Sequence, residues 1–179
     1  MTPGENSLKL ELGMQNLLPK GKGYSRSGGF TLIELLIVIV IIATLAVIVY
    51  VALNPSQRLK DARDARRNTD VETILTAIHT AIVDNKGTYP TGLSAGMSEA
   101  QLGTAGSACT VSSGGCSVST AACLDLSTPL VKYLKTVPID PSLTSASTKT
   151  NYSVVVDSNG IVTVKACGVE GSTNISISR

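Results

Sequence analysis

The feature that most constrains this chain is an apolar block from Phe30 to Leu53. The block is 24 residues long, and Glu34 is its only charged residue. As a helix rising about 1.5 Å per residue it spans about 36 Å, more than a hydrocarbon core of roughly 30 Å. Seventeen of its side chains are Leu, Ile, Val or Phe. They contribute roughly −7 kcal/mol on an insertion scale, against about 3 kcal/mol for one central acid, so the block is predicted to be a single membrane-spanning helix.

The charges before the block indicate its orientation. Residues 1–29 contain four of the 15 basic residues and two of the 13 acidic ones, with no acidic residue between Leu12 and Phe30. Because positive charge favours the cytoplasmic side, we expect the N-terminus inside and the C-terminal body outside. Residues 30–179 keep eleven basic and eleven acidic residues. No nucleic-acid-binding face is therefore predicted.

A secretory signal peptide and a plain single-pass anchor are alternative explanations of the block. A signal peptide has an apolar run of about 7–15 residues followed by a small-residue cleavage site. This run is longer, and the charged sequence NPSQRLKDARDARR follows it directly. Composition alone does not separate a plain anchor from other membrane helices, so the residues at the start of the block have to decide.

The start of the block, GGFTLIELL from Gly28 to Leu36, resembles the processing signal of type IV prepilins and pseudopilins. In that family an aspartyl peptidase facing the cytoplasm cuts after the glycine and methylates the new N-terminus. The resemblance implies a leader peptide of residues 1–29, a cut after Gly29 and N-methylation of Phe30. It also implies that Glu34 guides filament docking by attracting the N-terminal ammonium of a neighbouring subunit.

Elementary chemistry is consistent with these roles and also offers a simpler explanation for one of them. Gly29 leaves the backbone open to a protease. An ionisable residue such as Glu34 inside a membrane segment is costly and points to a function. The simpler explanation is that Glu34 lies near a helix N-terminus, where the helix dipole favours a carboxylate.

Residues 54–90 are predicted to continue the helix outside the membrane. Pro55 removes a backbone donor, so we expect a kink there, and the helical pattern resumes from Ser56 to about Asn85. One apolar face is predicted from the spacing of Val71, Ile74, Leu75, Ile78 and Ile82. The charged side chains of the preceding turns are expected to form a solvated collar: Asp61, Arg63, Asp64, Arg66 and Arg67.

Residues 91–179 are predicted to form a variable connection and a small antiparallel-sheet head. Residues 91–122 are rich in Gly, Ser, Ala and Thr, which is typical of a surface connection. Thr128-Pro129 predicts a short helix from Pro129 to about Lys135. The alternating runs Asn151–Asp157 and Ile161–Cys167 predict a hairpin. Ile175 and Ile177 are expected in an edge strand.

The predicted fold class is α+β. We expect the long N-terminal helix to be packed against the small antiparallel sheet, because neither element can bury its apolar face alone. The order of these elements, together with YPTG after the helix and the VPIDP segment, resembles bacterial pilins and major pseudopilins.

Four cysteines lie in the part expected outside: Cys109, Cys116, Cys123 and Cys167. There is no C-x-x-C pair and only one histidine, so no metal site is predicted. Disulfides are favoured, with three possible connectivities, although free thiols remain the alternative in a reducing compartment. We favour Cys109–Cys116 and Cys123–Cys167, the second of which closes about 45 residues and would stabilise by about 4 kcal/mol.

Catalysis is not predicted. The chain lacks a nucleophile elbow, a P-loop, a metal-binding histidine pair and a Rossmann glycine pattern. His79 is expected to be packed or half-exposed on the helix. Asp140 and Asp157 are expected in loops, but the acidic residues are too far apart in the sequence to assign a calcium site. No cofactor is expected.

Two classes of function remain open. The first is a structural subunit of a type IV pilus-like filament, cut by prepilin peptidase and assembled with copies of itself or other pilins on an inner-membrane platform. A pseudopilin of type II secretion or DNA uptake belongs to the same class. The second is a monomeric, membrane-tethered ligand-binding module. Both imply a single-pass protein in membrane lipid; the first also implies an extracellular pilus or pseudopilus.

Overall fold

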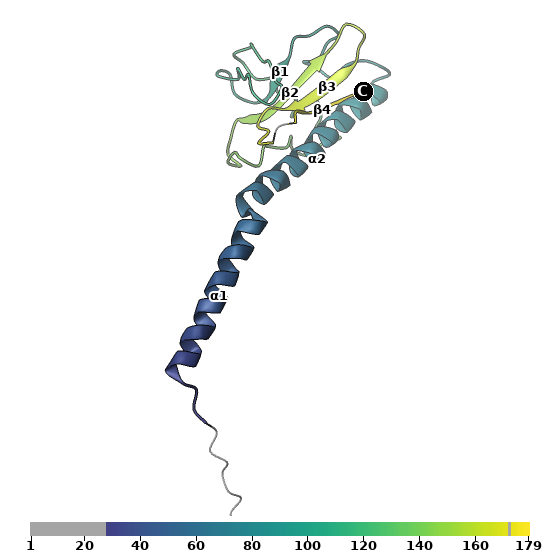
Figure 1. Ribbon diagram of the computed structural model, residues 1–179. Helices are drawn as coiled ribbons and strands as arrows, with labels where there is room; N and C mark the ends of the chain where they lie inside the picture. Colours follow the sequence, from purple (N-terminus) through teal and green to yellow (C-terminus); the bar gives the residue numbers. More distant parts are fainter. Residues whose placement is uncertain (1–27, 172) are drawn as a thin grey trace, which may run out of the picture. The chain divides into compact units, whose positions relative to one another are not determined.

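The computed structural model describes residues 28–171 and 173–179 (Figure 1). The chain divides into two units, Met1–Val47 and Ile48–Arg179, and we call the second the globular unit. The basic residues of the predicted leader, Lys9, Lys20, Lys22 and Arg26, lie outside the described residues.

Helix α1, Leu32–Leu53, contains the apolar block. None of its residues is buried, and Glu34 is the only acidic residue of its first turn. By length and composition, one helical segment in the described part of the chain, near its N-terminus, could cross a membrane. An apolar helix that buries nothing within its own chain requires lipid or other helices around it.

Helix α2, Pro55–Asp84, begins two residues after α1 ends. Between them Asn54 adopts a left-handed conformation with φ 40° and ψ 68°. Pro55 has no amide hydrogen and occupies the first turn of α2, where that loss costs least. The amides of Gln57 and Arg58 bond to the carbonyl of Asn54 and start the new helix. The interruption thus has a local cause in the Asn54-Pro55 pair.

The sheet contains four antiparallel strands in the order β1-β2-β3-β4. The strands are β1 (Ala100–Gly103), β2 (Lys149–Val156), β3 (Val162–Ala166) and β4 (Ile175–Ser178). The predicted hairpin is β2–β3, with Val156 opposite Val162 and Tyr152 opposite Ala166. The carboxylate of Asp157 closes its turn by accepting hydrogen bonds from the amides of Asn159 and Ile161.

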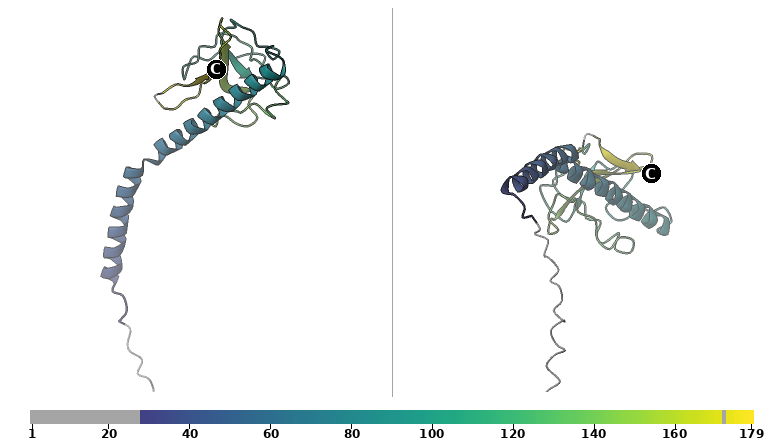
Figure 2. Two further views of the ribbon diagram at one scale, coloured as in Figure 1. Left: turned by 90° about the vertical axis from the view of Figure 1, so that its right-hand side faces the viewer. Right: turned by 60° about the horizontal axis from the view of Figure 1, so that its bottom comes forward.

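The core lies between α2 and one face of the sheet, along which α2 runs in Figures 1 and 2. The helix contributes the predicted apolar face, and Val71 and Ile78 are fully buried. The sheet contributes alternate residues of β2 and β3: Tyr152, Val154, Val156, Val162, Val164 and Ala166, all with no exposed surface. This packing confirms the predicted α+β architecture.

Two local predictions are wrong. Strand β1 lies inside the segment predicted to be a plain connection. The prediction failed because the four residues of β1 carry no strand pattern and are held in the sheet by pairing with β2. The predicted helix Pro129–Lys135 is instead a series of turns. The amides of Leu130 and Leu134 bond to the carbonyls of Leu126 and Leu130. A run this short gains too few hydrogen bonds to propagate as a helix.

The favoured disulfide connectivity is also wrong. The bonds are Cys109–Cys123 and Cys116–Cys167, with Cα–Cα distances of 5.2 and 5.4 Å. An antiparallel bridge between Val111 and Val118 folds the loop back on itself. The two arms of the loop then bring Cys109 to Cys123, and the tip carrying Cys116 reaches Cys167.

Candidate functional site

The described residues before α1, 28–31, belong to no helix or strand and are exposed. Gly28 and Gly29 are exposed, and a Cβ atom added at either would meet nothing within 4 Å. Phe30 is 75% exposed. In the described chain the Gly29–Phe30 peptide is therefore sterically accessible.

Thr31 caps the helix that follows. Its hydroxyl accepts a hydrogen bond from the amide of Glu34 at 3.2 Å, and its carbonyl accepts from the amides of Glu34 and Leu35. Thr31-x-x-Glu34 is the sequence pattern of a capping box, a local signal that the prediction did not include. A cut before Phe30 would leave Thr31 in the mature chain, so the cap and its hydrogen bonds would remain.

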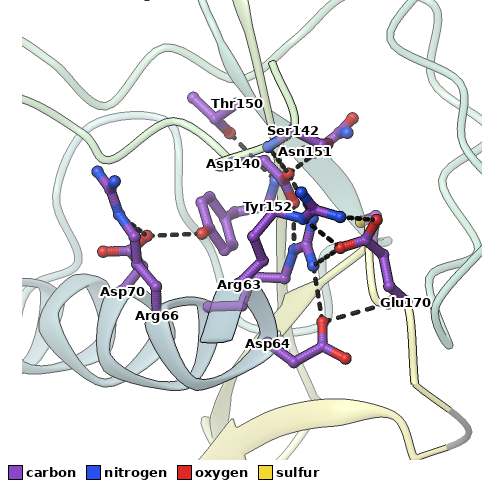
Figure 3. A network of polar contacts seen from close by, with 12 residues as sticks. Arg63, Asp64, Arg66, Asp70, Asp140, Ser142, Thr150, Asn151, Tyr152 and Glu170 are labelled. Carbon is purple, nitrogen blue, oxygen red and sulfur yellow. Dashed lines mark hydrogen bonds and ion pairs between the residues drawn. The ribbon is translucent and has the colours of Figure 1, made fainter. Parts of the chain in front are cut away.

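A second group of polar side chains joins α2 to distant segments of the chain. Figure 3 shows Arg63 and Asp64 of α2 with Asp140 and Glu170. The Arg67 guanidinium is completely buried and donates two hydrogen bonds of 2.7 Å to Asp140, whose side chain is also buried. It also donates to Asp64 at 2.7 Å and to Glu170 at 3.3 Å. The prediction of a solvated collar is therefore wrong for Arg67. The sequence did indicate that position 67 is buried, because it lies four and seven residues before Val71 and Ile74, on the same apolar face.

Two neighbours extend this cluster to the segment before β4. Arg63 donates two hydrogen bonds to the carboxylate of Glu170. Asp64 accepts hydrogen bonds from the amides of Glu170 and Gly171. We call these five side chains the Arg67 cluster: Arg63, Asp64, Arg67, Asp140 and Glu170. The cluster joins α2 to the VPIDP segment and to the segment before β4.

The cluster lowers the pKa of its carboxylates. Burial alone would raise the pKa of Asp140, but hydrogen bonds from Arg67 and Ser142 outweigh it and hold the pKa below its ordinary value. The pKa of Asp64 is lowered in the same way, against burial, by Arg67 and the backbone amides. The hydrogen bond from Arg63 lowers the pKa of Glu170. The cluster is therefore charged at neutral pH.

We expect acid to weaken the globular unit through this cluster. Since the folded pKa values are lowered, the stabilisation is complete above the ordinary values of 3.8 for Asp and 4.5 for Glu. It is lost as the pH falls through the lower folded values. Urea unfolding of the full chain in detergent should show a free energy that declines below about pH 4. The decline should be shallower in Asp140→Asn, and an identical slope in that variant would contradict the assignment.

The cluster links α2 to two distant segments of the globular unit. Each of its carboxylates is already bound by an arginine. In the part of the chain that the structure describes, no group of three or more His, Cys, Asp or Glu side chains could hold a metal ion. His79 is half-exposed on α2, with Nε2 3.1 Å from the carbonyl of Arg179.

Comparison with protein families bears on the N-terminal segment. Residues 24–50 match the family described as the prokaryotic N-terminal methylation motif. This segment is the type IV pilin and pseudopilin signal. Neither the curated proteins nor the solved structures gave a match. The methylation motif encloses Gly29, Phe30 and Glu34, and it confirms the resemblance inferred from GGFTLIELL.

The methylation motif supports a type IV pilin- or pseudopilin-type protein. Such proteins are structural and non-enzymatic in general. The motif also implies the general partners of that class, other pilins and prepilin peptidase. Together with an apolar N-terminal helix it fits membrane anchoring and a surface pilus.

Proposed function

We propose that this protein is a subunit of a type IV pilus-like filament, cut after Gly29 and assembled through α1. The observation that carries the proposal is the methylation motif at the start of a wholly exposed apolar helix. Before assembly α1 is surrounded by membrane lipid, with the N-terminus cytoplasmic and the globular unit outside. In the filament, α1 helices of neighbouring subunits replace the lipid.

Glu34 supplies the directional contact in this proposal. It is the one charged residue of α1. Cleavage before Phe30 would create an ammonium group four residues away, and the carboxylate of a neighbouring subunit would attract it. An ion pair between different copies is a heterologous contact, and repetition of such contacts builds an open helical assembly.

Cleavage is tested by the Gly29→Glu variant. Because the space around Gly29 is open, the folded chain accommodates the larger side chain, and we expect the peptidase alone to reject it. In cells with prepilin peptidase, the intact mass and N-terminal peptide of the wild type should start at a methylated Phe30. Gly29→Glu should retain residues 1–29, whereas Gly29→Ala should still be cut. Trimming of the glutamate variant at the same bond would overturn the proposed cleavage site.

Docking is tested at Glu34. Glu34→Gln should insert in the membrane at least as well as the wild type, since it removes the charge from the apolar block. We expect its share in purified filaments to fall at least tenfold, because a desolvated ammonium loses its partner. Glu34→Asp keeps the charge and should retain part of the assembly. Normal incorporation of Glu34→Gln would exclude the docking role and mean that another contact drives assembly.

A further inference from the structure

Cys116 lies midway between two other cysteines. It is seven residues from Cys109 and seven from Cys123, whereas its partner Cys167 is 51 residues away. In a flexible chain the probability of loop closure falls as the −3/2 power of length, so each local pair should form about 20-fold more often than Cys116–Cys167. Contacts of the folded chain therefore have to select the distant partner.

The turn Ser113–Cys116 brings Cys116 against the end of β3. Its Gly114 has a φ of 59°, and a Cβ atom there would lie 2.7 Å from the carbonyl oxygen of Cys167. The Ser113 hydroxyl donates a 2.8 Å hydrogen bond to that same carbonyl. The amide of Cys116 closes the turn onto the carbonyl of Ser113 at 2.9 Å. The turn thus contacts the backbone of Cys167 independently of the sulfur atoms.

A polar cluster on the sheet holds the other side of this turn. Lys165 Nζ donates to the carboxylate of Glu99 at 2.8 Å and to the carbonyl of Gly115 at 3.3 Å. The Ser153 hydroxyl donates to Glu99 and lies 3.2 Å from Cys116 Sγ. Ser153 has no exposed surface, and Glu99 is 9% exposed. Because side chains alternate along a strand, Ser153 lies on the face opposite Tyr152 and the core.

These contacts converge on one turn. Hydrogen bonds among Glu99, Ser153 and Lys165 would be enough to satisfy these buried polar groups. Lys165 and Ser153 nevertheless also contact the turn, at Gly115 and Cys116. We propose that the Ser113–Cys116 turn, docked on Glu99, Ser153 and Lys165, is a pairing template. It holds Cys116 at Cys167 and away from its local competitors before the disulfide forms. The inference does not depend on the proposed filament.

The chemistry that the template directs is ordinary thiol–disulfide exchange. The Cys116 thiolate attacks an oxidant of the disulfide class, forms a mixed disulfide and releases one thiolate. The Cys167 thiolate then attacks the Cys116 sulfur and releases the second thiolate. Two electrons pass from the cysteines to the oxidant, and the two cysteine protons go to solvent or to the released thiolates.

The test is the distribution of disulfides after oxidation of the reduced full chain in detergent. Oxidised glutathione is the oxidant, free thiols are then alkylated, and linked peptides are counted by mass spectrometry. In concentrated urea, wild type and variants should all favour the local pairs of Cys116. In native buffer the wild type should form mainly Cys116–Cys167. Lys165→Met should lower the ratio of Cys116–Cys167 to local pairs about tenfold, the size expected for a hydrogen bond to a charged group.

Lys149→Met is the matched control. Lys149 also donates to a carbonyl next to this loop, that of Ala108 at 2.9 Å, but in the described chain it makes no hydrogen bond to the Ser113–Cys116 turn. It should leave the ratio unchanged. If Lys165→Met fails to fold by circular dichroism, Ser113→Ala replaces it, because Ser113 is exposed and loses only one hydrogen bond. Wild-type ratios in the folded variant, or mainly Cys116–Cys167 pairing in urea, would overturn the template.

Discussion

Replacing Asp140 by alanine should lower the free energy of unfolding of the globular unit by about 3–5 kcal/mol, because it leaves a buried guanidinium without its main partner. Arg67 and the Asp140 side chain are both fully buried, and two 2.7 Å hydrogen bonds join them. Asp64 and Glu170 still contact Arg67, but neither reproduces this two-point contact. Urea unfolding of the full chain in detergent, followed by tyrosine fluorescence, measures the loss.

Two further variants show whether the effect belongs to the buried pair. Asp61→Ala removes an exposed carboxylate of the same helix, which among the described residues accepts a side-chain hydrogen bond only from Gln57. It should change stability by less than about 0.5 kcal/mol. Arg67→Met combined with Asp140→Leu replaces both charges by apolar groups and should recover most of the loss, since apolar replacements of buried pairs are often neutral or better. A loss below about 1 kcal/mol in Asp140→Ala would contradict the importance of the pair.

The parts of this protein that could be predicted from its sequence are those with a local signal. The membrane helix follows from the composition of consecutive residues, and the hairpin follows from alternation on either side of Ser158-Asn159-Gly160. The apolar face of α2 follows from its helical spacing. The helix cap Thr31 also has a local signal, the pattern Thr31-x-x-Glu34, which the prediction did not include.

The parts that could not be predicted depend on contacts between distant residues. Position 67 was readable as part of the buried face of α2, but nothing local shows that its partner is Asp140, 73 residues later. Strand β1 depends on pairing with β2 across 46 residues or more. The cysteines are the sharpest case. Four allow three connectivities, and loop length favours the short pairs that the folded loop excludes.

Removing Cys116 and Cys167 together should cost about 4 kcal/mol, because that disulfide closes the longer loop of the unfolded chain. Its sequence separation is 51 residues, against 14 for Cys109–Cys123, whose removal should cost about 3 kcal/mol. The double alanine variants are the appropriate ones, since they leave no odd thiol to form a new bond. Guanidinium unfolding of each full-length variant in detergent, under non-reducing conditions, gives both values.

The order of the two losses is the informative result. Three of the cysteines are buried, and Cys123 is half-buried. Both pairs therefore lose packing when their sulfur atoms are removed, and the difference in loop length adds about 1 kcal/mol to the loss for Cys116–Cys167. A larger loss for Cys116–Cys167 would then reflect the entropy of the unfolded chain. A larger loss for Cys109–Cys123 would mean that the disulfide loop is held mainly by its own short bridge. The polar contacts around Glu99 and Lys165 would in that case keep the loop on the sheet without the longer bond.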